Sequence, residues 1–251
     1  MQPTSQTRDY FIEAGFDPFA GSAYLFDIDG TLLHTRDGVH WNAFRRALRE
    51  VFGIESLLDT IPVHGNTDIG ILRAVAEQHQ VPRENFEREL PRVLELMGAD
   101  VERNCDGLRC ELCPAVRELL EELRERGKLL GVVSGNLESI GWRKIDAAGL
   151  RDFFAFGSFS DHAEQRVEIF RQGLARAQAM FARASGQSTG QPPLAADHCF
   201  FVGDTPADIR AAQALGAPAI AVASGIYDFA ELLASSPPVC VLSCRELLRL
   251  R

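Results

Sequence analysis

Two carboxylates separated by one residue follow an apolar run near the start of the chain. Asp27 and Asp29 come directly after residues 23–26, and Gly30 and Thr31 complete the segment. An apolar run that ends in an acidic, glycine-containing turn is typical of a buried parallel strand. On so short a loop, one carboxylate can attack phosphorus in phosphoryl transfer while the other donates a proton. A calcium loop would need further oxygen ligands at alternating positions, and two leucines occupy that space.

A second apolar run, over residues 128–133, leads into Ser134, Gly135 and Asn136. A hydroxyl and backbone N–H groups at the end of a strand suit the binding of a phosphate oxygen. Serine and glycine are also favoured in turns, so a purely structural explanation stays open. The segment is a candidate phosphate-binding loop.

Asp204 and Asp208 lie four residues apart, on either side of a Thr-Pro pair. Both carboxylates could face one cation, and Mg²⁺ prefers oxygen ligands while it retains several waters. The alternative is that Asp204 or Thr205 caps a helix that begins at Pro206, with Asp208 placed favourably for the helix dipole. The sequence leaves both interpretations open at this point.

These candidate residues depend on the elements around them. Apolar runs that predict strands cover residues 23–26, 128–133, 198–202 and 219–223. Helical patterns cover residues 114–126, 138–148, 167–184 and 206–215. The alternation predicts an α/β fold with a Rossmann-like parallel sheet and helices on both faces. In such sheets, ligands bind beyond the carboxyl ends of the strands, where the polar segments would converge.

A long stretch between the first and second polar segments interrupts this alternation. It contains amphipathic helical patterns over residues 40–52, 67–80 and 83–96. We therefore expect an α/β core formed by residues 1–36 and 106–251, and an all-helical domain, residues 37–105, inserted after the first strand. Residues 184–196 are rich in Ser, Gly, Gln and Pro, which predicts a surface loop.

Composition narrows the class of partner. The 251 residues carry a formal net charge of -9, which argues against the basic surface that non-specific nucleic-acid binding requires. The N-terminal residues lack the basic start and apolar run of a secretory signal, and no segment is apolar enough to span a membrane. We expect a cytoplasmic protein that acts on a small molecule, without a nucleic-acid or membrane partner. The sequence does not indicate its oligomeric state.

The six cysteines are interpreted as reduced thiols, because no export signal accompanies them. Cys105, Cys110 and Cys113 form a cluster that loosely resembles one arrangement of iron-sulfur ligands, but no fourth cysteine lies nearby. Partly buried thiols beside the start of a helix are the simpler interpretation.

Taken in order, these segments resemble the haloacid dehalogenase superfamily. Its phosphatases carry Asp-x-Asp-Gly-Thr, then Ser or Thr at a strand end, then a basic residue, then Gly-Asp-x-x-x-Asp. The resemblance covers residues 23–225 and points to the phosphatase branch with a helical cap after the first motif, similar to phosphoglycolate phosphatase. It implies that Asp27 is the nucleophile and becomes an aspartyl phosphate. Asp29 would then protonate the leaving alcohol and afterwards activate water.

The resemblance also implies the remaining site residues. Thr31 and Ser134 would hold phosphate oxygens, with Gly135 and Asn136 in the same loop. Mg²⁺ would be bound by Asp27, the backbone carbonyl of Asp29 and Asp204, with Asp208 binding directly or through water. A cation is needed because a dianionic ester repels a carboxylate nucleophile.

The basic residue of the third motif departs from the family pattern, which is usually a lysine often followed by proline. Arg166 lies at the corresponding place, before the predicted helix, and its guanidinium suits forked contacts to oxyanions. Lys144 is the competing residue, but its spacing is typical of an exposed helical face. We therefore assign the role of the basic residue of the third motif to Arg166.

Single residues distinguish a phosphatase from the other reactions of the superfamily. Asp29 argues against a dehalogenase, which generally lacks the second Asp. The absence of lysine from residues 37–105 argues against a phosphonatase. A sugar phosphomutase of the β-phosphoglucomutase type stays open, as does a non-catalytic binding protein that retains the fold. The predicted substrate is a small phosphorylated metabolite of unspecified identity.

In the predicted cap, Asn66 and Thr67 are either substrate contacts or only the cap of a helix. Trp41 and Phe44 fit the apolar face of the first cap helix, which favours a packing role. His34 and His40 lie near the hinge and are given no role.

Overall fold

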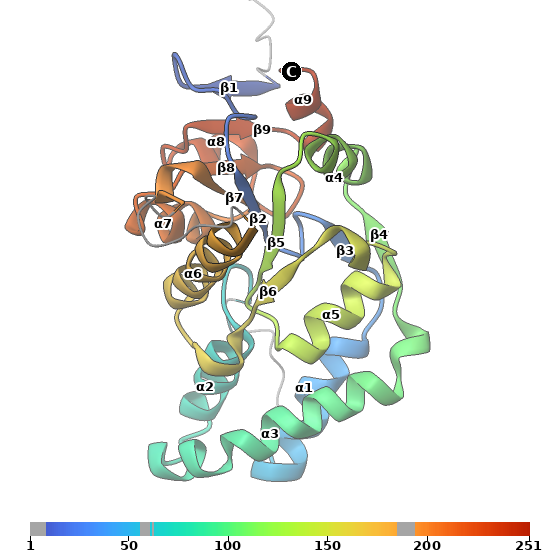
Figure 1. Cartoon of the computed structure of the whole chain (residues 1–251). Helices are drawn as coiled ribbons and strands as arrows, with labels where there is room; N and C mark the ends of the chain where they lie inside the picture. Colours follow the sequence, from blue (N-terminus) through green and yellow to red (C-terminus); the bar gives the residue numbers. More distant parts are fainter. Residues whose placement is uncertain (1–8, 56–60, 62, 185–193) are drawn as a thin grey trace, which may run out of the picture.

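The computed structural model describes residues 9–55, 61, 63–184 and 194–251. In Figure 1 the chain forms an α/β body with a layer of helices at its lower end. The loop predicted over residues 184–196 lies mostly outside the described residues.

A mixed sheet runs through the α/β body. Its strands are β1 (Tyr10–Ile12), β2 (Ala23–Phe26), β5 (Leu129–Val133), β6 (Phe156–Ser158), β7 (Cys199–Gly203), β8 (Ala219–Val222) and β9 (Val239–Val241). Their order across the sheet is β1-β9-β8-β7-β2-β5-β6. Every neighbouring pair is parallel except β1 with β9, which is antiparallel. The four predicted strands are therefore confirmed.

Helices alternate with these strands along the chain. They are α4 (Val116–Glu125), α5 (Glu138–Ala147), α6 (Arg166–Ala184), α7 (Pro206–Ala214), α8 (Phe229–Leu233) and α9 (Cys244–Leu248). The four predicted core helices are confirmed as α4, α5, α6 and α7, with ends that differ by two residues or fewer.

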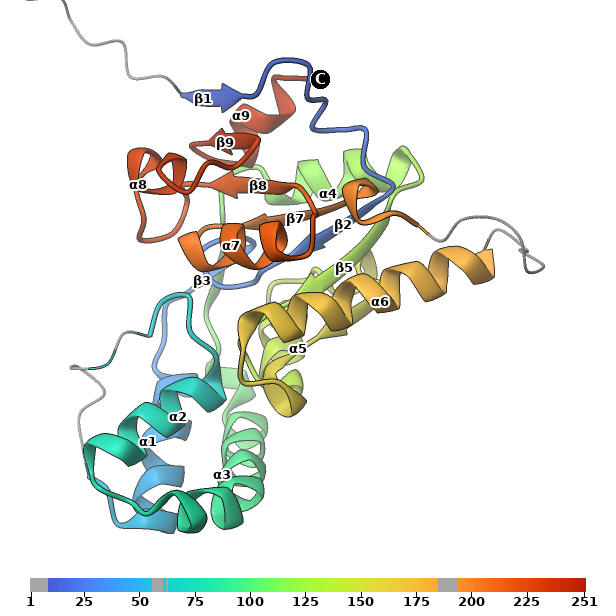
Figure 2. The ribbon, with the colours of Figure 1, turned by 90° about the vertical axis from the view of Figure 1, so that its left-hand side faces the viewer.

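The alternation of side chains along each strand builds two hydrophobic cores. Tyr24 and Phe26 of β2 belong to the core that includes side chains of α4, α5 and α9. Ala23 and Leu25 belong to the core on the other face, which includes side chains of α6, α7 and α8. Figure 2 shows α6 and α7 in front of the sheet and α4 behind it. The predicted fold class, with helices on both faces of a parallel sheet, is confirmed.

Three helices outside the body form what we call the helical layer. They are α1 (Val39–Phe52), α2 (Asp68–Gln78) and α3 (Arg83–Arg103). Their apolar faces, including Phe44, Leu72 and Phe86, pack into a third hydrophobic cluster. The layer lies apart from the sheet in Figures 1 and 2. This agrees with the expected all-helical insertion.

A short antiparallel ribbon joins the helical layer to the body. It pairs β3 (Leu33–Thr35) with β4 (Cys110–Leu112), so the chain leaves and re-enters the body at one place. The insertion thus begins after β3, and β1 precedes the strand that the sequence predicts as the first. Strands β1, β3, β4, β6 and β9 were missed because the three residues of each are too few to establish a period of two.

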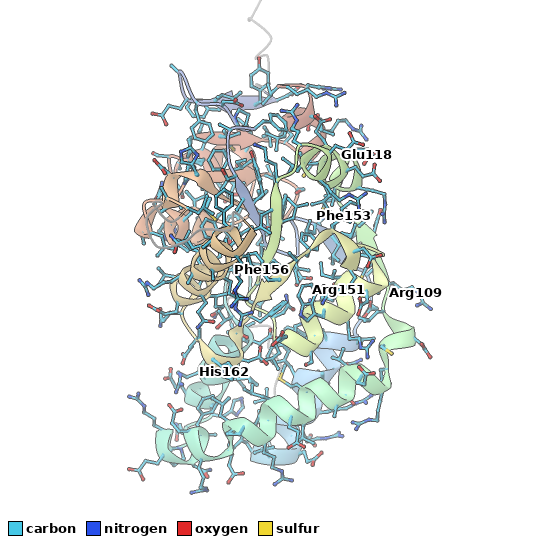
Figure 3. All side chains as sticks on the ribbon, in the orientation of Figure 1. Arg109, Glu118, Arg151, Phe153, Phe156 and His162 are labelled. Carbon is cyan, nitrogen blue, oxygen red and sulfur yellow. The ribbon has the colours of Figure 1, made fainter. Side chains whose placement is uncertain are left out.

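Helix α5 connects the two parts of the molecule. Ile145 packs in the core that includes side chains of α4 and α9, whereas Ile140 packs in the cluster of the helical layer. Arg143 of α5 forms a bidentate ion pair with Glu102 of α3, at 2.5 and 2.6 Å. Figure 3 shows the side chains on the ribbon, among them Phe156 of β6, which lies against Gly131 of the neighbouring strand. The helical layer is therefore held by α5 as well as by the ribbon.

The stacked rings of Phe170 and Phe201 in the core predict a measurable loss of stability when one ring is removed. Phe170 of α6 is fully buried, and its ring stacks on Phe201 of β7 with centroids 4.5 Å apart. Phe170→Ala is expected to lower the free energy of unfolding by about 3–5 kcal/mol, because it removes a buried ring and leaves a cavity. Urea unfolding measures the change. Phe181→Ala, on the exposed side of the same helix, is the control and should cost less than about 1 kcal/mol; equal losses would contradict this packing.

Candidate active site

The predicted site residues converge at the carboxyl ends of three adjacent strands. Asp27 follows β2, Ser134 follows β5 and Asp204 follows β7, and β2 lies between the other two. They line a cavity of about 330 Å³ that also reaches the helical layer. The convergence follows from the parallel order of the strands, as the sequence predicts.

Three buried carboxylates lie close together at this cavity, and two of them, Asp27 and Asp204, line it. Oxygen atoms of Asp27, Asp204 and Asp208 all lie within 4.8 Å of one another. Burial raises the pKa of Asp27 to about 7. The positive charge of Arg166 opposes this effect, and the negative charges of Asp208 and Asp29 add to it. Burial and the charges of Asp27 and Asp208 also raise the pKa of Asp204 well above its usual range. Such crowded oxygen ligands fit a divalent cation, which would relieve their repulsion.

The loop after β2 brings Asp27 and Asp204 together through two local features. Gly30 has φ +85°, and a Cβ at this position would lie 2.3 Å from Asp204 Oδ2, so only glycine fits there. The Thr31 hydroxyl donates a hydrogen bond to Asp204 Oδ1 at 3.0 Å. Thr31 is fully buried and is not among the residues that line the cavity. In the structure it orients Asp204, whereas the resemblance implied a direct phosphate contact.

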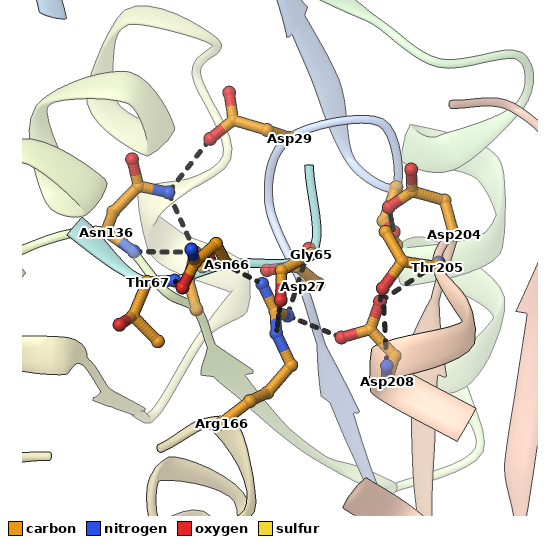
Figure 4. A network of polar contacts seen from close by, with 12 residues as sticks. Asp27, Asp29, Gly65, Asn66, Thr67, Asn136, Arg166, Asp204, Thr205 and Asp208 are labelled. Carbon is orange, nitrogen blue, oxygen red and sulfur yellow. Dashed lines mark hydrogen bonds and ion pairs between the residues drawn. The ribbon is translucent and has the colours of Figure 1, made fainter. Parts of the chain in front are cut away.

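Arg166, at the start of α6, is the cation nearest to Asp27. Its Nη1 lies 3.6 Å from Asp27 Oδ2 and contacts Asp208 Oδ1 (Figure 4). Burial opposes its charge, but the carboxylates of Asp208, Asp27 and Asp204 outweigh burial and hold the pKa of Arg166 above its usual range. Its remaining N–H groups donate to the backbone carbonyls of Gly65 and Asn66, at 3.1 and 3.3 Å. The structure thus brings Arg166 into the site, as predicted.

Asp208 also caps a helix, as one of the two interpretations proposed. Its Oδ2 accepts hydrogen bonds from the Thr205 hydroxyl at 2.6 Å and from the Thr205 N–H at 3.1 Å. Thr205 Oγ1 in turn accepts from the Asp208 N–H, and Pro206 is the first residue of α7. Both oxygens of Asp208 therefore already have protein partners, which favours contact with a cation through water.

The side chain of Asp29 points away from the three carboxylates toward a second group of residues. Its Oδ2 accepts hydrogen bonds from Lys144 Nζ at 2.6 Å and from Asn136 Nδ2 at 2.8 Å. Thr35 donates to its Oδ1 at 3.1 Å. Burial would raise the pKa of Asp29, but the charge and hydrogen bond of Lys144 and the hydrogen bond of Asn136 lower it to about 2. Asp29 is therefore ionised in this arrangement.

The interpretation of Lys144 as a residue on an exposed helical face is wrong. Its side chain is 3% exposed, and it also donates to Asn136 Oδ1 at 2.8 Å. Two signals in the sequence could have identified it. Lys144 lies four residues after Ile140, so a helix places both residues on one face, which is the buried face of α5. Lysine is also rare in this chain, because Lys128 and Lys144 are the only lysines among 26 Lys and Arg residues. Thr35 was also missed, because nothing in its spacing marks it.

The loop after β5 meets the helical layer within the site. Asn136 donates to Ser134 Oγ at 2.8 Å, and the Asp68 N–H donates to the Gly135 carbonyl at 2.7 Å. A Cβ on Gly135 would lie 2.5 Å from the Asn66 carbonyl oxygen, so glycine is what allows this close approach. Thr67 caps α2 by accepting from the Gly70 N–H, so the capping interpretation of Thr67 is confirmed.

The three clustered cysteines are partly or fully buried, and they do not gather into a group of metal ligands within the described residues. Burial raises the pKa of Cys110 to about 11 and that of Cys113 to about 12. These two thiols are therefore protonated near neutral pH and take no part in the site.

Comparison with known proteins assigns the family. Residues 24–222 match the family model of the haloacid dehalogenase-like hydrolases. The chain belongs to this family and is an enzyme of its phosphatase branch. A phosphoglycolate phosphatase of Yersinia pseudotuberculosis serotype I (strain IP32953) is 28% identical over 222 residues, which cover 87% of each chain.

Solved structures share the fold. A predicted phosphatase from Clostridium acetobutylicum superposes with a TM-score of 0.65 at 16% identity, covering 91% of this chain and 97% of its own. A predicted phosphoglycolate phosphatase from Haemophilus somnus superposes with a TM-score of 0.56 at 20% identity, covering 87% and 92%. In the part of the chain that the structure describes, no helix is long and apolar enough to cross a membrane.

The carboxylate cluster predicts stabilisation by magnesium. Mg²⁺ at 100 times its dissociation constant should add about 2.7 kcal/mol to the free energy of unfolding. For a protein of this size, each kcal/mol corresponds to about 2–4 °C in melting temperature. Thermal unfolding with and without Mg²⁺ measures the shift. Asp204→Asn should remove most of it, whereas Asp197→Asn, an exposed control, should retain it. The same shift in both variants would contradict binding at this cluster.

Proposed function

We propose that the protein is a magnesium-dependent phosphatase that hydrolyses a small phosphorylated metabolite through an aspartyl-phosphate intermediate. The observation that carries this proposal is the position of Asp27, which lines the cavity 3.6 Å from Arg166 and within 4.8 Å of the other two carboxylates. The helical layer would act as its cap, formed by residues 37–105 as the sequence predicts.

Asp27 is the nucleophile in this proposal. One of its oxygens attacks phosphorus, the bond between phosphorus and the alcohol oxygen breaks, and the phosphoryl group remains on Asp27. Water then attacks phosphorus, which releases inorganic phosphate and restores the carboxylate. Arg166 lies close enough to Asp27 to contact a transferring phosphoryl oxygen and to stabilise its negative charge.

Asp29 transfers the protons of both steps. Its Oδ2 is ionised beside Lys144 in the free protein, and the approach of a negatively charged phosphate raises the pKa of a neighbouring carboxyl. Asp29 can then carry a proton to the departing alcohol and afterwards accept one from water. Lys144 and Asn136 act as positioning residues, because they fix the carboxylate through hydrogen bonds.

The three buried carboxylates supply the ligands for Mg²⁺. Asp27 and Asp204 would bind it directly, together with the backbone carbonyl of Asp29, and Asp208 would bind through water. When bound, the cation would offset the negative charge of the carboxylates and of the phosphate, so that the carboxylate of Asp27 can attack the phosphate ester. Ser134 and the backbone of Gly135 and Asn136 would hold phosphate oxygens.

The relatives support the class of substrate. The curated Yersinia protein is named for phosphoglycolate, a small phosphorylated acid, but 28% identity does not transfer the particular ester. The phosphomutase alternative shares the same core residues, and it would be revealed by phosphoryl transfer to a second sugar phosphate instead of water. A cytoplasmic location stays a prediction from the sequence.

The nucleophile is tested by one isosteric change. Asp27→Asn should lower kcat for a chromogenic phosphate ester by at least about 1,000-fold, because the amide does not attack phosphorus. Steady-state kinetics with Mg²⁺ measure the loss. Asp161→Asn, outside the cavity lining, is the matched control and should retain activity within about threefold. Hydrolysis by Asp27→Asn at the parent rate would exclude the mechanism.

Lys144 is tested against the only other lysine of the chain. Lys144→Met should lower kcat by about 10-fold to 100-fold, because Asp29 loses its strongest partner, with a smaller effect on KM. Lys128→Met, at the opposite end of β5, should change kcat by less than about twofold. If both variants keep the parent kcat, Lys144 does not position Asp29 for catalysis.

A further inference from the structure

The body and the helical layer contribute different side chains to the cavity. The body contributes Asp27, Asp29, Asp204, Lys144 and Arg166, and the apolar residues of the lining include Trp41, Phe44 and Ile71 of the helical layer. Phe44 is 2% exposed and belongs to the cluster of the helical layer, and Trp41 packs beside it with ring centroids 6.4 Å apart. The prediction that these aromatic residues pack is confirmed, and together with Ile71 they also form an apolar wall, contributed by the helical layer, in the lining of the cavity.

Lys144 and Arg166, the lysine and arginine among the described lining residues, already have protein partners. Lys144 is bonded to Asp29 and Asn136. Arg166 contacts Asp208 and Asp27 and donates to two backbone carbonyls. The helical layer contributes no Lys or Arg to the described lining of the cavity. A phosphate can use Arg166, but a second anionic group farther along the substrate would meet no lysine or arginine of the helical layer, only His64 and His40, and His40 already contacts Asp68.

Two acidic residues of the inserted segment, residues 37–105, strengthen this restriction. Asp37 and Asp68 both line the cavity. Asp37 is held in place because its oxygens accept from the backbone N–H groups of Val39 and Arg109, at 2.7 and 2.6 Å. Asp68 accepts from the Leu137 N–H at 2.8 Å and contacts His40 Nε2 at 3.1 Å. An anionic group placed here would lose water and face like charges, which is unfavourable.

We propose that the alcohol released by the enzyme is uncharged and places an apolar surface against Trp41, Phe44 and Ile71. This inference rests on the proposed phosphatase function and narrows its substrate class. A cavity of about 330 Å³ is at the small end of ligand sites, so the alcohol is small. Substrates with a second phosphate or a carboxylate are selected against by the acids and because the described lining holds no lysine or arginine besides Lys144 and Arg166.

Four primary alkyl phosphates of similar intrinsic reactivity test the inference. They are benzyl phosphate, 2-hydroxyethyl phosphate, phosphoglycolate and phosphoethanolamine, each assayed by phosphate release from the full chain with Mg²⁺. Phosphoglycolate differs from 2-hydroxyethyl phosphate by a carboxylate in place of an uncharged CH₂OH group. We expect kcat/KM to be highest for benzyl phosphate and at least about tenfold lower for phosphoglycolate than for 2-hydroxyethyl phosphate.

Substitution of the apolar wall tests the contact directly. Trp41→Ala should lower kcat/KM for benzyl phosphate by about tenfold and that for 2-hydroxyethyl phosphate by less, because only the former has a large apolar surface. Trp41→Leu retains part of the apolar contact and should lie between. Trp142→Ala is the matched control, since the chain's other tryptophan lies on α5 outside the cavity lining and stacks with Arg151. Melting temperatures establish that each variant is folded.

The possible outcomes separate the inference from the function on which it rests. Hydrolysis of phosphoglycolate as fast as or faster than 2-hydroxyethyl phosphate would overturn the inference and leave the phosphatase intact. A preference for phosphoethanolamine over both uncharged esters would show that the acids recruit a cation, and would also overturn it. If no ester is hydrolysed faster than by Asp27→Asn, the proposed function fails and the inference fails with it.

Discussion

Repulsion between buried carboxylates at the end of the sheet is the constraint around which this molecule is built. Asp27 and Asp204 follow adjacent parallel strands, and Asp208 reaches the same place from the first turn of α7. Burial without a positive partner would drive them to protonate. Arg166 offsets part of this charge, and the crowded carboxylate oxygens fit a divalent cation. In the proposed function, that cation would also offset the charge of the phosphate ester.

The ion pair between Asp29 and Lys144 gives the two aspartates of the loop different electrostatic environments. Burial, with a smaller effect of the neighbouring carboxylates, raises the pKa of Asp27, whereas Asp29, two residues later, pairs with Lys144, which lowers its pKa to about 2 against the effect of burial. The two carboxylates of one short loop therefore have different environments, as the roles of nucleophile and proton carrier require. Lys144 comes from α5, which also packs on the helical layer, so the geometry of Asp29 depends on how that layer is held.

The sequence predicts the strand ends well because parallel strands place their polar ends at one edge regardless of detail. Asp27, Ser134, Asp204 and Asp208 meet for this reason. What it does not predict depends on tertiary packing. Strands β1, β3 and β4 have three residues each and no readable period. Lys144 was misplaced because a charged residue is expected on an exposed face, although its spacing from Ile140 places it on the buried one. The partners of Asp29 come from β3 and α5, and sequence spacing does not link them.

The central claim is that Asp27 carries the phosphoryl group during turnover. Rapid acid quenching of the enzyme with excess substrate and Mg²⁺, followed by proteolysis and mass spectrometry, measures it directly. Our account predicts one phosphoryl group on the peptide that contains Asp27, which borohydride converts to homoserine at that residue. A full burst of released alcohol with the phosphoryl group on another residue, or on none, would contradict it.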